Sequence, residues 1–190
     1  EEYDPIANSW TTKASIPTQE DAGAIVAYNG KIYVAGGYPN GKKHYVYDPQ
    51  LDSWSDEPTD LPFKIWDCGS ALIGQYFYII GGSADANVYT SVIKYDLING
   101  GSWSNAGWMS FGFAKCAVSV HNGKMYVFTS NWAQIHQHCG VFDPSTGSWT
   151  NLSDAPYPFM AATPTSIDGY VYLLRDSAGS NYMPNFFAYD

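Results

Sequence analysis

A set of short motifs returns four times along this chain at intervals in the forties, and that period constrains the fold more than any other feature. A Ser-Trp pair occurs in every repeat, with its tryptophans spaced 44, 49 and 46 residues apart, at Trp10, Trp54, Trp103 and Trp149. An apolar segment with a central tyrosine also recurs, at residues 31–37, 76–82, 124–130 and 170–176. A pair of an aromatic residue and aspartate recurs with a similar spacing, and its aspartates are Asp4, Asp48, Asp96, Asp143 and Asp190. A period of this length, built from strand-like segments, predicts a propeller-type array of sheets.

Residues 18–62 show what one repeat contains. The apolar run 24–28 is followed by Asn29-Gly30, a pair that favours a tight hairpin turn because both central positions need a positive φ. We expect the return strand at 31–35, a third strand at 44–47 that ends at Asp48-Pro49, and a short fourth strand at 53–55. Each repeat is therefore predicted to be a four-stranded antiparallel meander.

Such sheets have two apolar faces and must stack on their neighbours to bury them. We assign the four repeated tryptophans to this packing. The pair Gly36-Gly37 ends the second strand where side chains would crowd, and Gly81-Gly82 repeats it. The hairpin turn also recurs, at Asn122-Gly123 and Asp168-Gly169, with a looser version at Gly74-Gln75.

An apolar strand ending in Gly-Gly, then Tyr-Asp-Pro, then Trp, resembles the kelch repeat, and the segment 3–17 is especially similar to bacterial kelch repeats. The resemblance covers essentially the whole chain and implies a kelch β-propeller whose first strands line a central channel. The chain departs from the family at Thr129-Ser130 and Arg175-Asp176, where the double glycine is lost. An arginine common near the start of kelch repeats is also replaced, by Gln19-Glu20, Lys64 and Lys115 in successive units.

The phase of the repeats leaves the size of the ring open. The repeat units are approximately 18–62, 63–110 and 111–156, with a fourth formed by 157–190 plus 1–17 if the N-terminal strand completes the last blade. Because kelch rings usually contain six or seven blades, a portion of a larger ring is the favoured interpretation. A closed four-bladed ring and a ring shared by two copies are the alternatives.

Composition excludes several classes of partner. The net charge of −9 argues against nucleic acid, which needs a basic surface, and no apolar run approaches the roughly 20 residues that span a bilayer. The many Tyr, Trp, Ser, Asn and Gly residues and the low share of charged residues, 14%, suit an extracellular or periplasmic protein, and a cytoplasmic location is the alternative. Asn151-Leu152-Ser153 is a glycosylation sequon, but one such triplet is expected by chance.

The cysteines and histidines give weak signals. Cys68 and Cys116 fall at equivalent positions of the inner strand, where small residues are expected, and we interpret them as two buried thiols rather than a disulfide. His136 and His138 precede Cys139 and would share one face of a strand, but two histidines without further ligands predict no metal site. We find no pattern typical of a nucleophile, an acid–base pair or a phosphate loop, and expect no cofactor.

A binding surface is predicted from the meander itself, because the loop between strands two and three lies on the same face as the linker between blades. Rigid scaffolds usually carry recognition on such loops. Aromatic residues outside the repeat pattern fall in these segments, at Trp66, Trp108, Trp132, Tyr38, Phe111, Phe113, Phe159 and Tyr182. The polar residues expected beside them are Lys64, Asp67, Lys115 and Gln19.

These observations predict non-catalytic recognition of a protein or a glycan by an aromatic-rich loop face. The kelch resemblance implies an alternative, a sugar-modifying enzyme similar to sialic acid epimerases or galactose oxidase. The first would need charged channel residues, for which the chain offers Lys64, Lys115 and Arg175, and the copper site of the second cannot be assembled here. A structural segment of a larger multidomain protein is the third hypothesis.

Overall fold

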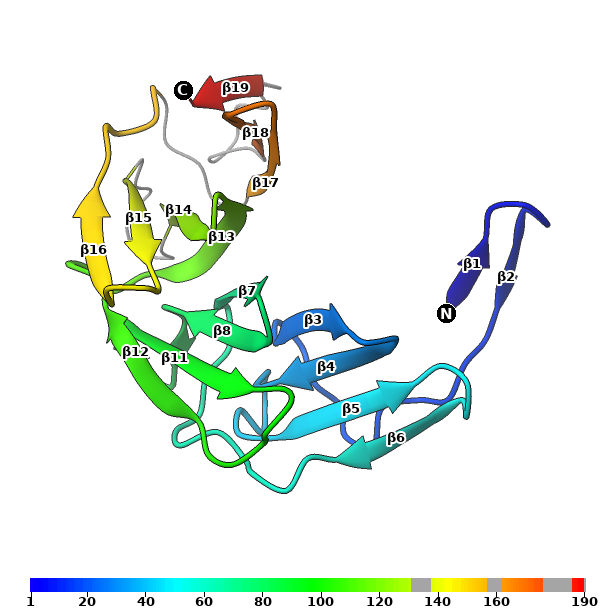
Figure 1. Ribbon diagram of the computed structural model, residues 1–190. Helices are drawn as coiled ribbons and strands as arrows, with labels where there is room; N and C mark the ends of the chain where they lie inside the picture. Colours follow the sequence, from blue (N-terminus) through cyan, green and yellow to red (C-terminus); the bar gives the residue numbers. More distant parts are fainter. Residues whose placement is uncertain (131–137, 157–161, 176–185, 190) are drawn as a thin grey trace.

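The computed structural model describes residues 1–130, 138–156, 162–175 and 186–189, and these residues form antiparallel sheets that follow one another around an arc (Figure 1). The first complete sheet has the strand order β3-β4-β5-β6: β3 (Ala24–Tyr28), β4 (Lys31–Ala35), β5 (His44–Asp48) and β6 (Ser53–Asp56). The second contains β7 (Gly69–Ile73), β8 (Tyr76–Ile80), β11 (Ser91–Asp96) and β12 (Ser104–Trp108), with a small hairpin of β9 (Ser83–Ala84) and β10 (Asn87–Val88) between β8 and β11.

The third sheet contains β13 (Ala114–His121), β14 (Lys124–Ser130), β15 (Cys139–Asp143) and β16 (Ser148–Asn151). The last sheet has three strands among the described residues, β17 (Ala162–Ile167), β18 (Tyr170–Arg175) and β19 (Phe186–Tyr189). The predicted meander is therefore confirmed, and the architecture is that of a β-propeller. We refer to the four sheets as blades one to four.

The hairpin turns form as their sequences predict. Asn29 and Gly30 have φ values of 48° and 75°, and Asn122 and Gly123 have 48° and 71°. Both pairs join strands in direct register, with Tyr28 opposite Lys31 in blade one. The turn residues thus set which side chains of each strand face the neighbouring blade.

The core lies between the blades. Between blades one and two, His44, Phe77, Tyr95 and Trp103 are buried, with the Trp103 ring 5.4 Å from both the Phe77 and the Tyr95 rings. Blades two and three bury Ile80, Val92, Met125, Val127 and Phe142, and Trp149 packs against this cluster. Blades three and four share a smaller cluster that includes Phe128, Val171 and Leu173. Packing of Trp103 and Trp149 between blades is therefore confirmed.

The double glycines allow the next linker to approach closely. The Gly37 N–H donates to the carbonyl of Ile65 (2.8 Å), and the Gly82 N–H donates to the carbonyl of Phe113 (2.6 Å). A Cβ on Gly36 would lie 2.6 Å from the Ile65 oxygen, which real contacts do not tolerate. The crowding predicted at Gly36-Gly37 is confirmed, and its cause is the linker into the following blade.

The N-terminal strands do not complete the last blade, contrary to the repeat unit that joined residues 1–17 with 157–190. β1 (Glu2–Asp4) pairs with β2 (Ser9–Thr11) in a separate hairpin, which lies far from β17–β19 in Figure 1. Tyr3 pairs with Trp10 in the register that Tyr47 keeps with Trp54. The hairpin thus corresponds to the third and fourth strands of a blade, and blade four already has its third strand, β19.

Because no sheet of the described residues covers this hairpin, Trp10 is 68% exposed, and its ring lies 5.0 Å from the Tyr3 ring between centroids. The inter-blade packing predicted for Trp10 is not formed. Trp54 is half-buried and packs on Tyr47 in its own blade, while its Nε1–H donates to the carbonyl of Ala14 (2.9 Å).

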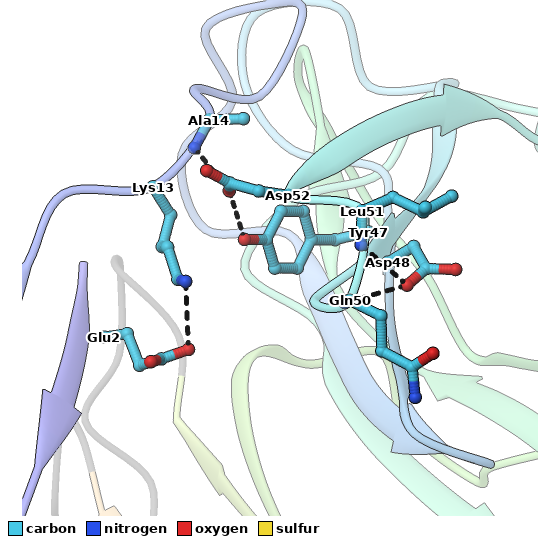
Figure 2. A network of polar contacts seen from close by, with 8 residues as sticks. All are labelled: Glu2, Lys13, Ala14, Tyr47, Asp48, Gln50, Leu51 and Asp52. Atoms are coloured by element: carbon cyan, nitrogen blue, oxygen red, sulfur yellow. Dashed lines mark hydrogen bonds and ion pairs between the residues drawn. The ribbon is translucent and has the colours of Figure 1, made fainter.

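The linker that follows the β1–β2 hairpin is attached to the outer edge of blade one by polar contacts (Figure 2). Asp52 Oδ1 accepts hydrogen bonds from the Ala14 N–H (2.9 Å) and from the Tyr47 hydroxyl (2.5 Å). The hydrogen bond to Asp52 is the main reason why the pKa of Tyr47 is raised to about 12. Lys13 forms an ion pair with Glu2 (3.4 Å), so the linker also contacts the hairpin. Within the described residues, the chain has no helix of the length and apolar character that crossing a bilayer would require.

Candidate binding face

Linkers and loops meet on one face, as the meander predicts. In the linker into blade one, Asp21 forms a bridge with Tyr38 of the blade's loop between its second and third strands. In the linker into blade two, Trp66 forms the equivalent bridge with Ser83. We call the surface formed by residues 19–22, 36–43, 62–67, 81–90 and 109–113 the loop face.

Apolar side chains are exposed along this face. Tyr38 is 58% exposed and meets the half-buried Trp66 edge-on at a centroid distance of 5.5 Å. Val88 is 46% exposed and Phe111 is 50% exposed. Their two segments lie against each other, as the backbone of Gly112 shows: a Cβ added there would lie only 3.1 Å from the Val88 oxygen. These four side chains extend from blade one to the linker into blade three.

The remaining predicted aromatics do not add exposed side chains to the loop face. Trp108 is 61% exposed but ends the outer strand β12, opposite Ser91, instead of lying in the linker. Phe113 is buried between blades two and three. Trp132, Phe159 and Tyr182 lie outside the described residues.

The predicted polar residues are divided between two places. Asp67 and Lys115 line a cavity of about 250 Å³ with Ala22, Gly23, Cys68, Cys116 and Ala117, at the starts of the inner strands. The backbone links these positions, since the Asp67 N–H donates to Ala22 (2.9 Å) and the Lys115 N–H donates to Asp67 (2.6 Å). Lys64 and Gln19 are exposed and do not line this cavity.

Cys116 is buried and Cys68 is half-buried at the starts of the inner strands, and Cys139 is buried on the third strand of blade three. Cys68 and Cys116 are not joined by a disulfide, and burial raises the pKa of each thiol to about 12. A thiol with so high a pKa is a poor nucleophile at neutral pH. The described residues contain no group of three or more His, Cys, Asp or Glu side chains placed to hold a metal, and His136 lies outside them.

A second cavity, of about 190 Å³, opens where the linker into blade three meets the end of that blade's outer strand. We call it the Phe111 pocket, and its lining comprises Phe111, Phe113, His138, Cys139, Trp149, Asn151, Leu152 and Asp154. His138 Nδ1 lies 2.8 Å from Asp154 Oδ1, and the Phe111 ring stacks on the His138 ring at 5.7 Å and 18°. Sequence reasoning named Phe111 and Phe113 for the face but missed His138, Asn151 and Asp154, since only tertiary structure brings them together.

Comparison with known proteins finds kelch proteins as relatives. Kelch-like protein 25 of Xenopus tropicalis is 26% identical in an alignment of 164 residues that covers 83% of this chain and 27% of the relative. Kelch-like protein 15 of Danio rerio is 29% identical over 182 residues, 81% of this chain and 30% of the relative. An F-box/kelch-repeat protein of Arabidopsis thaliana is 25% identical over 90% of this chain and 45% of its own length. The chain thus spans less than half the length of these relatives.

The solved structure of YjhT is similar in fold, with a TM-score of 0.75 at 16% sequence identity over 87% of this chain and 62% of that one. No protein-family model matches the chain.

Proposed function

This chain belongs to the kelch-repeat β-propeller family, and from that premise we propose that it is a non-catalytic scaffold that binds a protein partner through the loop face. The observation that carries this proposal is the run of exposed apolar side chains on that face, Tyr38, Val88 and Phe111, with the half-buried Trp66 beside Tyr38. They project from loops that backbone hydrogen bonds hold to neighbouring linkers, so little conformational freedom is lost on binding. Exposed aromatic residues of this kind dominate the energy of protein interfaces.

The test is quantitative affinity capture from the native source with the wild-type chain and a Tyr38→Ser/Val88→Ser double variant. Both side chains are exposed, so the fold should be unaffected, and we expect the captured partner to fall at least tenfold. Leu51→Ser, in the exposed β5–β6 turn, is the matched control because Leu51 is 73% exposed yet lies away from the face. Equal capture by the double variant and the control would contradict the proposal.

Glycan binding is the second candidate, and the edge-on pair of the exposed Tyr38 and the half-buried Trp66 supports it, since aromatic rings stack on sugars. Titration of tryptophan fluorescence against a broad glycan panel tests it, and an unchanged spectrum with every glycan would exclude it. Catalysis is not proposed, because the basic residues that it would use do not converge: Lys115 lies at the inner strands, whereas Lys64 lies on the exposed linker.

We also propose that further strands extend the arc beyond blade one. Ile32 and Val34 on its outer face are half-buried, whereas the equivalent Phe77 and Ile79 of blade two are fully buried by the preceding blade. The intact denatured mass of the protein from its native source tests this. A mass well above 20.9 kDa supports further strands in the same chain, whereas a mass of 20.9 kDa contradicts further strands in the same chain.

We also propose an extracellular or periplasmic location for the protein. Fractionation of the same source tests this location.

A further inference from the structure

We propose that the Phe111 pocket is the anchor site of the partner, and that it takes one bulky apolar side chain of an extended peptide segment with a lysine or arginine beside it. This inference rests on the proposed function, because it names the chemistry of the partner that the loop face binds. It concerns a pocket that the repeat pattern does not single out.

The interior of the pocket is apolar and of the right size for one side chain. Phe113 and Cys139 are 2% and 5% exposed and form its floor, while Phe111, Trp149 and Leu152 form its walls. Its volume of about 190 Å³ is below the roughly 300–1,000 Å³ of sites for drug-sized ligands. A side chain of leucine or phenylalanine fits this space, whereas a disaccharide would be too large.

The rim offers a donor and an acceptor that suit a peptide backbone. Asn151 Oδ1 already accepts from the Trp149 Nε1–H (2.6 Å) and the Ser110 hydroxyl (2.7 Å), which leaves the Asn151 Nδ2 hydrogens to donate to a ligand carbonyl. Asp154 Oδ1 lies against His138 Nδ1 (2.8 Å), and no bond to Asp154 Oδ2 forms within the described part of the chain. These contacts hold both side chains in place before a ligand arrives, which favours binding.

The charge at the rim selects the residue beside the anchor. Asp154 is exposed and acidic, and the chain as a whole has 18 acidic against nine basic residues. A lysine or arginine next to the anchor would meet Asp154 Oδ2 and be steered by the negative field, whereas an acidic neighbour would be repelled.

Selection from a phage library of random linear peptides against the intact chain tests this inference. We expect enrichment of sequences that pair a bulky apolar residue with lysine or arginine. A selected peptide, synthesised with a fluorescent label, should bind Phe111→Ala at least tenfold more weakly in a polarisation assay. Asp154→Lys should lose binding of the basic peptide and gain binding of the same peptide with glutamate in place of the basic residue. Leu51→Ala is the control that should leave binding unchanged, and thermal melts verify that each variant is folded.

The outcomes separate this inference from the proposed function. Peptides that bind Phe111→Ala and Asp154→Lys as well as wild type, but lose binding to Tyr38→Ser/Val88→Ser, would overturn the pocket and leave the loop face supported. Failure to enrich any apolar–basic pattern would also overturn the pocket. Loss of partner capture in Tyr38→Ser/Val88→Ser is measured independently, so failure of the proposed function would be recognised there.

Discussion

Gly36 shows how one missing side chain sets the spacing between two blades. A Cβ at Gly36 (φ 71°) would lie 2.6 Å from the Ile65 backbone oxygen, whereas Gly30 (φ 75°) has nothing within 4 Å of the same position. The two glycines therefore share a backbone conformation but differ in their surroundings. We expect Gly30→Ala to cost about 1 kcal/mol, the usual penalty of a left-handed alanine, and Gly36→Ala to cost roughly 2–3 kcal/mol more, as overpacking does. Urea unfolding of both variants measures the difference, and equal costs would show that the linker adjusts freely.

His44 is a buried histidine surrounded by aromatic rings, 4.7 Å from Tyr95 and 5.3 Å from Trp103 between ring centroids. Burial lowers its pKa from 6.5 to about 4, an effect that the nearby Thr59 backbone only partly offsets. The unfolded chain then binds the proton more tightly, so stability is complete above about pH 6.5 and is lost as the pH falls towards 4. At 1.36 kcal/mol per pKa unit, the loss is roughly 3 kcal/mol.

His44→Leu should abolish this pH dependence, because the variant has no proton to bind at this position. The free energy of unfolding of the variant, measured by urea denaturation at pH 7 and pH 4.5, should change much less between the two values than that of the wild type. A wild-type slope that persists in His44→Leu would assign the acid sensitivity to another group.

At the scale of the element, the aromatic-Asp pair of each repeat ends its third strand with a side-chain-capped turn. The carboxylate Oδ1 accepts the backbone N–H groups of the second and third residues after it, at Asp4, Asp48 and Asp96, and that of Ser145 at Asp143. Hydrogen bonds from Asn99 lower the pKa of Asp96 to about 2, and bonds from Ser145 and Lys124 do the same for Asp143. These bonds favour the ionised form, so their contribution to stability is present above about pH 4 and is lost as the pH falls through 2.

Asp96 therefore offers a specific test of the capped turn. Asp96→Ala should lower the melting temperature by about 2–4 °C at pH 7, a typical shift for loss of a cap in a chain of this size. Asp96→Asn keeps the oxygen acceptor without the charge, so it should melt close to wild type at pH 7 and lose less stability between pH 4 and 2. Thermal melts by circular dichroism over this pH range provide the measurement, and an alanine variant that melts like wild type would show that the turn forms without its cap.

Most of the fold was predictable at this scale because the signals are local. The turn pair Asn29-Gly30 and the apolar segments on either side of it specify a hairpin without reference to any other blade. The candidate site was predicted less well, because its residues come from different repeats. The Trp66 and Tyr38 rings meet in a linker and a loop that the sequence identifies, but the contact between His138 and Asp154 depends on where two loops meet, which no sequence spacing encodes.

At the scale of the whole molecule, the arc has two different ends. In the part of the chain that the structure describes, blade four has three strands, and β1 and β2 form a hairpin that no other sheet covers (Figure 1). The repeat phase predicted that a strand within residues 1–17 completes the last blade, whereas among the described residues β2 pairs with β1 and not with β19. A sequence period gives the unit of a repeat protein, but the number of units in the assembly depends on contacts between its ends.

The outer face of blade one leads to the final prediction. Ile25 on β3 is 57% exposed, beside the half-buried Ile32 and Val34 of β4, and an uncovered sheet face of this kind favours association with any similar surface. The purified 190-residue chain should therefore self-associate as its concentration rises. Ile25→Glu should shift its weight-average mass in sedimentation equilibrium towards 20.9 kDa with no loss of melting temperature, because Ile25 contributes little to the core. Leu51→Glu, which adds the same charge in the distant β5–β6 turn, should leave association unchanged. A wild-type chain that stays monomeric at millimolar concentration would mean that Ile32 and Val34 tolerate exposure, and the case for strands beyond blade one would then rest on the register of β1 and β2 alone.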